Sequence, residues 1–113
     1  MYMLRVYWAM ALISEFFPEI EGFQWDEGNS SKSWSRHRVT QTEAEQVFQN
    51  RPIVLKGELA YAGGEVRHFA FGRTDAGQLL TMVFTVRRSL IRVISARPMS
   101  RQERRRYAQA TGP

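Results

Sequence analysis

The segment formed by residues 78–107 constrains the fold most strongly, because it joins two apolar strands to a basic helix. Residues 78–86 are almost continuously apolar and rich in Val, Phe and Leu, which is typical of a central strand buried on both faces. Residues 90–95 alternate more clearly between apolar and polar side chains. Between these strands, residues 87–89 (Arg-Arg-Ser) are few enough to close a hairpin.

The helix that follows this hairpin has a clear start signal. Ser100 and Glu103 have the S-x-x-E spacing of a capping box, in which each residue binds a backbone N–H group of the other. Thr40 and Glu43 form a second box, which predicts a helix that continues through Phe48.

Shorter patterns predict the rest of the sheet. Residues 53–55 and 59–61 are strand candidates, residues 67–73 alternate as a strand does, and residues 75–77 form a turn. The sequence therefore predicts an α+β domain, with an antiparallel meander, helices grouped on one side and a C-terminal basic helix.

A short strand and a polar helix are expected at the start of the domain. Residues 22–26 place Phe23 and Trp25 on one face of that strand. Asp26 follows and can cap a helix over residues 27–37, although serines and a glycine weaken that helix.

The first residues form an apolar extension. Residues 4–17 are strongly apolar but shorter than a bilayer span, and no cleavage site typical of a signal peptide follows them. We interpret residues 1–21 as an appended helix or as sequence upstream of a later start codon. Residues 22–109 then form the domain, and residues 110–113 a frayed tail.

The charge is unevenly distributed. Residues 1–60 contain 6 basic and 8 acidic side chains, net −2, whereas residues 61–113 contain 10 basic and 3 acidic, net +7. Of the 16 cations, 14 are arginines, which bind phosphate and carboxylate groups bidentately. Three interpretations stay open: a solvated basic surface, a face that binds a polyanion, and a face that meets an acidic protein.

The lack of cysteine excludes disulfides, thiolate metal sites and a cysteine nucleophile. The two histidines do not have the spacing of zinc ligands. We therefore expect no cofactor, a cytoplasmic location and no association with a membrane.

Seven short patterns, in order, connect the chain to a known family. They are F-x-W-D-E at Phe23–Glu27, R-H-R-V at Arg36–Val39, E-A-x-x-V-F at Glu43–Phe48, R-x-x-A-x-G-R-T at Arg67–Thr74, V-F-T at Val83–Thr85, I-R-V-I-S-A-R at Ile91–Arg97 and E-R-R-R-Y at Glu103–Tyr107. From Phe23 to Tyr107 the chain resembles BrnT toxins, the ribonuclease halves of BrnT/BrnA type II toxin–antitoxin pairs, which are similar to the RelE group of small bacterial ribonucleases. It departs from the family pattern at Arg36 and Arg38, where lysine and glycine are usual.

The resemblance implies a RelE-like endoribonuclease that cleaves RNA, in particular mRNA, without a metal ion. It also implies a cognate BrnA-like antitoxin with a ribbon–helix–helix domain, so that operator DNA is bound only through the complex. The candidate catalytic residues are Arg36, His37, Arg67, Arg97 and Tyr107, and the candidate RNA-binding residues are Arg73, Arg92, Arg101, Arg104 and Arg105.

Metal-free RNA cleavage needs a base for the 2′-hydroxyl, charge stabilisation at the phosphorane and an acid for the leaving 5′-oxygen. Arginine stays protonated, so the arginines can supply only the charge, and each can equally be a solvated or ion-paired surface residue. His37 is the candidate base or acid, because histidine is the side chain best suited to exchange a proton near neutral pH, with a packing or helix-capping role as the alternative. Tyr107 would contact the substrate or the leaving group, or else anchor the terminal helix.

Two other functions fit the same residues. A catalytically degenerate member of the family would bind nucleic acid or the antitoxin, and its binding would be sensitive to salt without cleavage. A scaffolding protein would have neither an effect on growth nor a stoichiometric partner.

Overall fold

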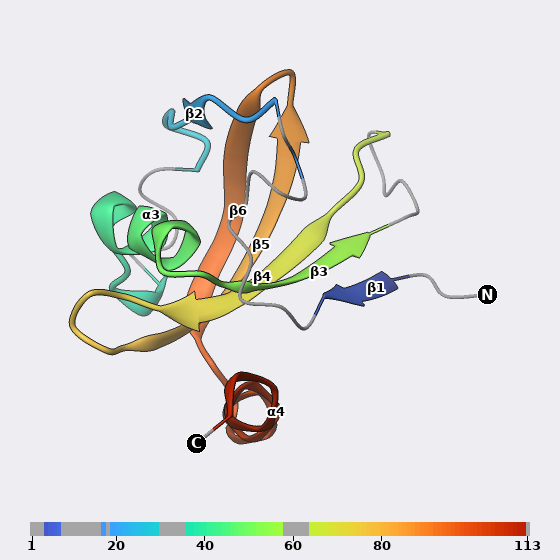
Figure 1. The fold of residues 1–113 in the computed structure, drawn as a ribbon. Helices are drawn as coiled ribbons and strands as arrows, with labels where there is room; N and C mark the ends of the chain where they lie inside the picture. The colour runs from blue at the N-terminus through green and yellow to red at the C-terminus, as the bar shows by residue number, and fades with distance from the viewer. Residues whose placement is uncertain (1–3, 8–16, 18, 30–35, 58–63, 113) are drawn as a thin grey trace.

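A computed structural model describes residues 4–7, 17, 19–29, 36–57 and 64–112 of the chain. These residues form a six-stranded sheet, two helices and a helical turn at residues 36–37 (Figure 1). In chain order the elements are β1 (Leu4–Tyr7), β2 (Gly22–Phe23), α3 (Gln41–Gln49), β3 (Ile53–Gly57), β4 (His68–Arg73), β5 (Leu79–Arg87), β6 (Leu90–Pro98) and α4 (Arg101–Thr111). The predicted α+β class is confirmed.

The strand order across the sheet is β1-β3-β4-β5-β6-β2. Strands β3 to β6 form the predicted antiparallel meander, and β1 adds to β3 in the antiparallel sense. β2 pairs in parallel with the first two residues of β6. The carboxyl half of β6 is therefore an edge among the described residues.

Both predicted hairpins form. Between β4 and β5 the Thr74 amide donates to the Gln78 carbonyl at 2.9 Å, and Gly77 has a φ of 88°, which glycine adopts without strain. Arg88 and Ser89 join β5 to β6, and Arg88 has a φ of 56°. A two-residue hairpin turn that matches the twist of its strands requires a positive φ at the first turn residue, which is Arg88 here. This conformation costs an arginine about 1–2 kcal/mol.

The main core lies between α3 and one face of the sheet. Ala44, Val47 and Phe48 are buried on that face, and the Phe48 ring meets the Phe84 ring edge-on with the centroids 5.1 Å apart. The strands contribute Val54, Ala70, Leu80, Met82, Phe84, Ile91, Val93 and Ala96. A Cβ added at Gly72 would lie 3.0 Å from Val47 Cγ1, so the lack of a side chain there lets α3 approach β4 closely.

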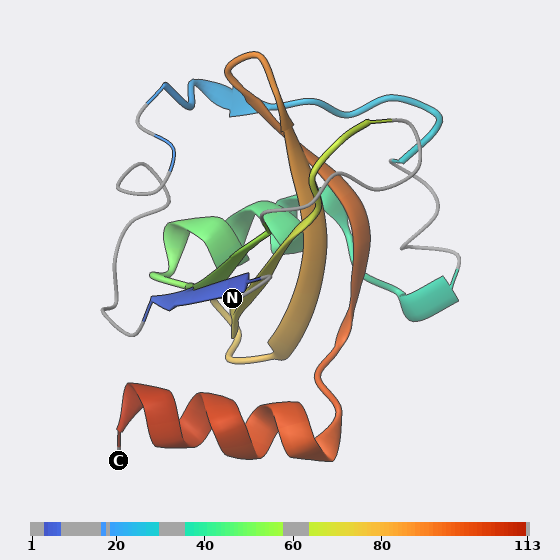
Figure 2. The ribbon, with the colours of Figure 1, turned by 90° about the vertical axis from the view of Figure 1, so that its right-hand side faces the viewer.

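A second, smaller cluster holds α4. Its members are Ile53, Met99 and Tyr107, with Phe71, Leu79 and Ala110 packed against them. The three strand residues of this cluster each neighbour a main-core residue in sequence, so strand alternation places them on the opposite face of the sheet. The expectation that the helices group on one side is therefore wrong for α4. Figure 2 shows it below the lower end of the strands, apart from α3.

A β-bulge in β6 decides which side chains reach the α4 face. A register shift opposite the middle of β5 leaves Ile94 as an extra residue, and alternation restarts after it. Val93 and Ala96 consequently both point into the main core although they are an odd number of residues apart. Arg97 is then directed to the face that carries α4.

The N-terminal extension is not a helix where it is described. Residues 4–7 form β1 on the edge of β3, and Phe17 is buried in the main core. The other residues of the extension at positions 1–3, 8–16 and 18 lie outside the described part of the chain. An apolar run alone is compatible with either a helix or a strand. Pairing with the edge of β3 explains why residues 4–7 form a strand.

Two further expectations need correction. Asp26 caps a turn, not a helix: its Oδ1 accepts a hydrogen bond from the Gly28 amide at 2.8 Å, and residues 27–29 are a turn. The predicted tail is partly ordered, since α4 continues to Thr111. The predicted strand at residues 59–61 and residues 30–35 of the predicted helix lie outside the described residues.

None of the described helices is long and apolar enough to span a membrane.

His68 lies on the main-core side of β4 and is only 6% exposed. Its ring lies against Phe17 and Phe84, with centroids 4.9 and 5.3 Å away. Nδ1 accepts a hydrogen bond from the Gly57 amide at 2.9 Å, which requires that nitrogen to be unprotonated. Burial, with the Lys56 charge adding to it, lowers the pKa of His68 to about 4. This histidine therefore belongs to the core.

We expect His68 to make the fold sensitive to acid. Because its pKa falls from 6.5 to about 4 on folding, the unfolded chain binds more protons between these values, and the free energy of unfolding decreases as the pH falls through this range. The decrease should be about 3 kcal/mol between pH 7 and pH 4. His68→Asn keeps an acceptor for Gly57 and does not titrate. Urea unfolding of this variant should lose that pH dependence, and an unchanged dependence would contradict the account.

Candidate functional site

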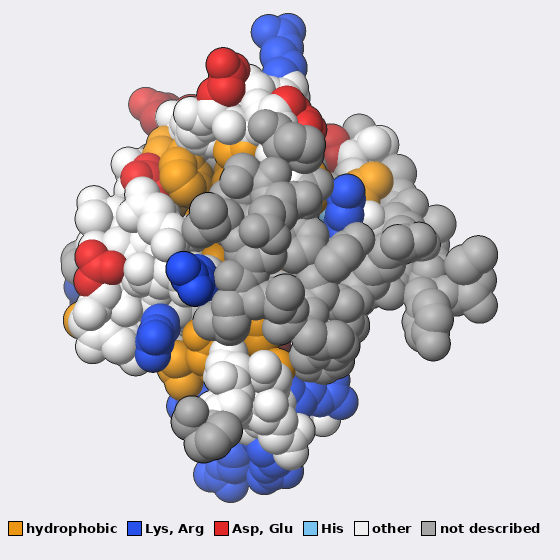
Figure 3. All heavy atoms as spheres, viewed as in Figure 1, with side chains coloured by type: hydrophobic (Ala, Val, Ile, Leu, Met, Phe, Trp, Pro, Cys, Tyr) orange, Lys and Arg blue, Asp and Glu red, His pale blue; other side chains and the backbone are white. Residues whose placement is uncertain are grey.

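Cationic side chains gather around α4. Figure 3 shows them at the bottom of the view, with hydrophobic side chains just above them, between the helix and the sheet. The exposed arginines of the helix are Arg101, Arg104, Arg105 and Arg106. The candidate site is built where this helix meets the carboxyl end of β6.

Both predicted capping boxes form. At the start of α4, Ser100 Oγ accepts from the Glu103 amide at 3.1 Å, and Glu103 Oε1 accepts from the Ser100 amide at 2.8 Å. Thr40 and Glu43 make the same pair of bonds at the start of α3. Each box satisfies N–H groups that the first turn of a helix leaves without partners.

The carboxylate of Glu103 also binds two strands. Oε1 accepts from Thr81 Oγ1 at 3.0 Å and from Arg97 Nη1 at 2.8 Å, and Oε2 accepts from Arg97 Nη2 at 2.9 Å. The Arg97 guanidinium, followed by the Ser100 amide and the Thr81 hydroxyl, lowers the pKa of Glu103 to about 2. The carboxylate is therefore charged at neutral pH and joins α4, β5 and β6 at one point.

Arg97 is held in one orientation but stays accessible. Two parallel bonds to Glu103 fix the plane of its guanidinium, and 37% of the side chain is exposed. A fork fixed in this way loses little conformational freedom when a phosphate binds its open edge. Arg97 is thus the candidate catalytic arginine whose geometry the structure defines best.

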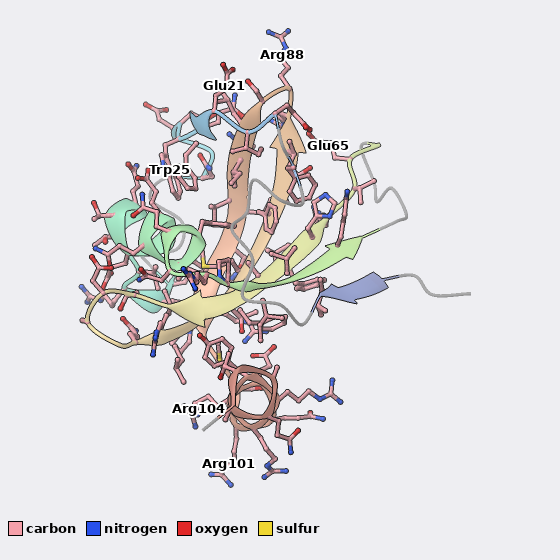
Figure 4. All side chains as sticks on the ribbon, viewed as in Figure 1. Glu21, Trp25, Glu65, Arg88, Arg101 and Arg104 are labelled. Atoms are coloured by element: carbon pink, nitrogen blue, oxygen red, sulfur yellow. The ribbon has the colours of Figure 1, made fainter. Side chains whose placement is uncertain are left out.

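The arginines of α4 have different positions around the helix. In Figure 4, Arg101 points away from the sheet and Arg104 points to one side of the helix. Arg104 is exposed, whereas Tyr107, three residues further along the helix, is buried. Arg106 lines a cavity between α4 and the sheet.

Tyr107 anchors α4 to the sheet. It is 8% exposed and belongs to the second cluster, with Ile53 and Met99. Burial raises the pKa of Tyr107, with the nearby Arg73 acting in the opposite direction. Tyr107 is therefore a protonated phenol at neutral pH, and it has a structural role whatever its role in chemistry.

Arg36 and His37 form the helical turn that precedes α3. Arg36 is exposed and His37 is half-buried. Figures 1 and 2 place this turn beyond the free edge of β6, level with the carboxyl half of that strand. No hydrogen bond joins His37 to Arg97 or Tyr107 in the described structure. His37 and Arg97 thus lie toward the same end of β6, with no hydrogen bond between them among the described residues.

Arg67 lies near the other end of the sheet. Arg97 pairs with Thr81, which in turn pairs with Phe71, four residues after Arg67. With a rise of about 3.3 Å per residue and a strand spacing of about 4.8 Å, the Cα atoms of Arg67 and Arg97 are about 16 Å apart. The structure therefore does not place Arg67 next to Arg97.

Arg92 is occupied by an ion pair. Its Nη1 and Nη2 donate to Asp26 Oδ2 and Oδ1 at 2.7 and 3.1 Å, and only 14% of the side chain is exposed. Asn29, which is buried next to this pair, donates to the Gln24 and Val93 carbonyls. Trp25 Nε1 donates to Glu45 at 2.7 Å. The F-x-W-D-E segment thus fastens the chain after β2 to β6 and α3.

The structure brings Arg97 together with two residues that sequence reasoning did not assign to the site. Glu103 was expected only as a helix cap, and Thr81 only as part of a strand. Arg106 was likewise missed among the arginines of α4. The S-x-x-E spacing is a signal for Glu103, but nothing local shows that its second oxygen faces an arginine of β6.

Fold and charge together define a small α+β domain whose arginine-rich helix is suited to binding a polyanion. The model of the family described as ribonuclease toxin, BrnT, of type II toxin–antitoxin system matches residues 25–103. The chain belongs to this family, so an RNA substrate and an antitoxin partner are implied. No curated protein matches the chain. The family match includes His37, Arg67, Arg97 and Glu103, and it ends before Arg104 and Tyr107.

We expect Glu103→Gln to destabilise the protein by about 1–2 kcal/mol at neutral pH, because the bond to Arg97 loses its charge while the cap is kept. The folded pKa of about 2 lies below the ordinary value of 4.5, so the contribution of the carboxylate is complete above about pH 4.5 and is lost as the pH falls toward 2. The variant should therefore approach the wild type in stability at low pH.

The matched control is Glu43→Gln, which changes the equivalent cap of α3, where no bond to an arginine is present among the described residues. Thermal unfolding at pH 7 and at pH 2.5–5 compares the two variants. Equal losses of stability for both would show that the bond between Glu103 and Arg97 contributes nothing measurable.

Proposed function

We propose that this protein is an endoribonuclease that cleaves RNA, with mRNA as its target, and that the reaction needs no metal ion. The 2′-oxygen attacks the adjacent phosphorus, and the bond from phosphorus to the 5′-oxygen breaks. A base removes the 2′-proton, and an acid protonates the leaving oxygen. The products carry 2′,3′-cyclic phosphate and 5′-hydroxyl ends.

One observation carries this proposal: Glu103 orients the guanidinium of Arg97, and the Arg97 side chain stays 37% exposed beside the arginines of α4. A preoriented cation stabilises the charge that develops on the phosphorane without having to reorganise during the reaction. Because the neighbouring arginines add positive charge, the neutralisation of Arg97 by one carboxylate leaves the surface cationic.

His37 is the group we propose as base or acid. It comes from the turn beyond the edge of β6, at the same end of that strand as Arg97 (Figure 2). Arg36 would contact the phosphate from this side. Tyr107, a neutral phenol at neutral pH, would donate a hydrogen bond to the substrate or the leaving group.

The other arginines have a positioning role in this proposal. Arg73, Arg101, Arg104 and Arg105 are exposed at or near α4 and would bind the RNA backbone, and Arg67 would contact a more distant nucleotide. Arg92 donates to Asp26 with both terminal nitrogens, so its contribution to RNA binding would require that ion pair to open.

We further propose that the antitoxin neutralises the protein by covering the cationic surface of α4. A partner with a BrnA-like ribbon–helix–helix domain would then carry the contacts to operator DNA. The charge of the last 53 residues, net +7 at positions 61–113, supports an acidic covering segment.

A second candidate function is RNA binding without cleavage. The ion pair between Arg97 and Glu103 also supports this alternative. Both terminal nitrogens of Arg97 already donate to Glu103, so they are not available to stabilise a phosphorane while that ion pair is closed. This alternative predicts that RNA binds with strong salt dependence and stays intact.

We expect the purified, partner-free protein to cleave labelled RNA in excess EDTA and to leave the product ends given above. Arg97→Ala should slow cleavage by about 10²-fold or more, as the loss of a charge-stabilising donor does elsewhere. Arg97→Lys should also be slow, because lysine keeps the charge but not the fork.

The matched control is Arg88→Ala, which removes the same charge at the opposite end of the sheet (Figure 4) and should leave the cleavage rate unchanged. Circular dichroism and thermal unfolding confirm that the variants are folded. RNA that stays intact with the folded wild type, both alone and with ribosomes, would reject the ribonuclease in favour of the binding function.

A further inference from the structure

A cavity of about 300 Å³ lies between α4 and the sheet. Its lining combines strand residues of the α4 face with one side of the helix: Ile53, Leu55, Phe71, Ser100, Gln102, Glu103, Arg106, Tyr107 and Ala110. The volume is at the lower end of the range for small-molecule sites. It lies directly beside the bond between Glu103 and Arg97.

The cavity has an apolar floor and a polar rim. Ile53 is buried, and Leu55 and Phe71 are half-buried at the floor. The Phe71 ring is nearly parallel to the Phe69 ring, at an interplanar angle of 11°. At the rim, Gln102 and Arg106 are long, polar and exposed. From α4, Tyr107 and Ala110 pack against the apolar strand residues beside the cavity.

The hydrogen-bonding groups of the cavity are unequally available. The two oxygens of Glu103 already accept from Arg97, Thr81 and the Ser100 amide. The side chains of Gln102 and Arg106 are exposed, so their polar groups can meet a ligand.

We propose that this cavity takes a purine base of the RNA substrate. The inference rests on the proposed function, because it requires the RNA backbone to run along the arginines of α4. A base is an uncharged aromatic ring with a polar edge, joined to an anionic chain. It therefore matches an apolar floor that includes the Phe71 ring, beneath a polar rim that carries Arg106.

The residues at the rim favour purines. A glutamine amide pairs with the N6 and N7 edge of adenine, and an arginine with the O6 and N7 edge of guanine. Gln102 and Arg106 are four residues apart and share one side of the helix. A pyrimidine offers neither the N7 acceptor nor the area to cover Phe71 and Tyr107 together.

The test separates base binding from cleavage. Short 2′-O-methyl RNA has no 2′-hydroxyl to attack, so it binds without reacting. We would measure the affinity of the full-length protein for fluorescent 2′-O-methyl hexamers of adenosine, of uridine and of abasic nucleotides. The adenosine hexamer should bind about tenfold more tightly than the abasic one, and the uridine hexamer should be close to the abasic one.

Filling the cavity should remove this preference. Ala110→Leu adds apolar atoms to the lining and should reduce the affinity for the adenosine hexamer to that of the abasic hexamer, with unchanged thermal stability. The matched control is Ala108→Leu, which adds the same atoms at an exposed position of α4 outside the lining. If Ala110→Leu does not fold, Arg106→Ala is used as the test variant and Arg105→Ala as its matched control. Arg106→Ala should remove the preference, whereas Arg105→Ala should weaken both hexamers equally.

Equal affinities of the wild type for the adenosine and abasic hexamers would overturn the proposal. So would an adenosine preference that survives both Ala110→Leu and Arg106→Ala, which would place the base elsewhere. If the cavity instead receives a side chain of the protein partner, Ala110→Leu would leave all three hexamers unchanged. An adenosine preference lost on Ala110→Leu, in a protein that does not cleave RNA, would support the cavity and reject only the catalytic function.

Discussion

The site depends on the hydrogen bonds that the carboxylate of Glu103 accepts. This carboxylate closes the capping box of α4, accepts the Thr81 hydroxyl from β5 and holds both terminal nitrogens of Arg97 from β6. One side chain thus determines where the basic helix begins, how it meets the sheet and which way the arginine faces. The small cluster of Ile53, Met99 and Tyr107 adds apolar contact further along the helix. Removing Glu103 would leave α4 attached mainly through that cluster.

Local signals in the sequence were sufficient for most of the elements. The two capping boxes, the alternation of residues 67–73 and the apolar run of β5 each depend on neighbouring residues, and each predicted an element that the structure confirms. The family was equally readable, because the spacing of several short patterns is itself a local property. The conformation of residues 4–7 could not be predicted in this way, since an apolar segment forms a strand or a helix according to what it packs against.

The arrangement of the site depends on contacts between distant residues, and the sequence does not contain them in readable form. The extra residue at Ile94 changes the face to which Arg97 points, and no turn residue or glycine marks it. The sequence predicts Arg92 as an RNA-binding residue and Arg97 as a catalytic one, but it does not show that Asp26, 66 positions away, binds Arg92. Both arginines are paired with a carboxylate, but 14% of the Arg92 side chain is exposed against 37% for Arg97. That difference in access separates a residue that fastens β6 from one that can meet a substrate.

The measurement that tests this account most directly is a double-mutant cycle on RNA cleavage with Arg97→Lys, Glu103→Gln and the double variant. If Glu103 acts by orienting the Arg97 fork, each single variant should lose most of the effect, and the double variant should be little slower than either one. Losses that simply add in free energy would contradict the account, because they would show that Arg97 contributes to cleavage independently of the carboxylate that holds it.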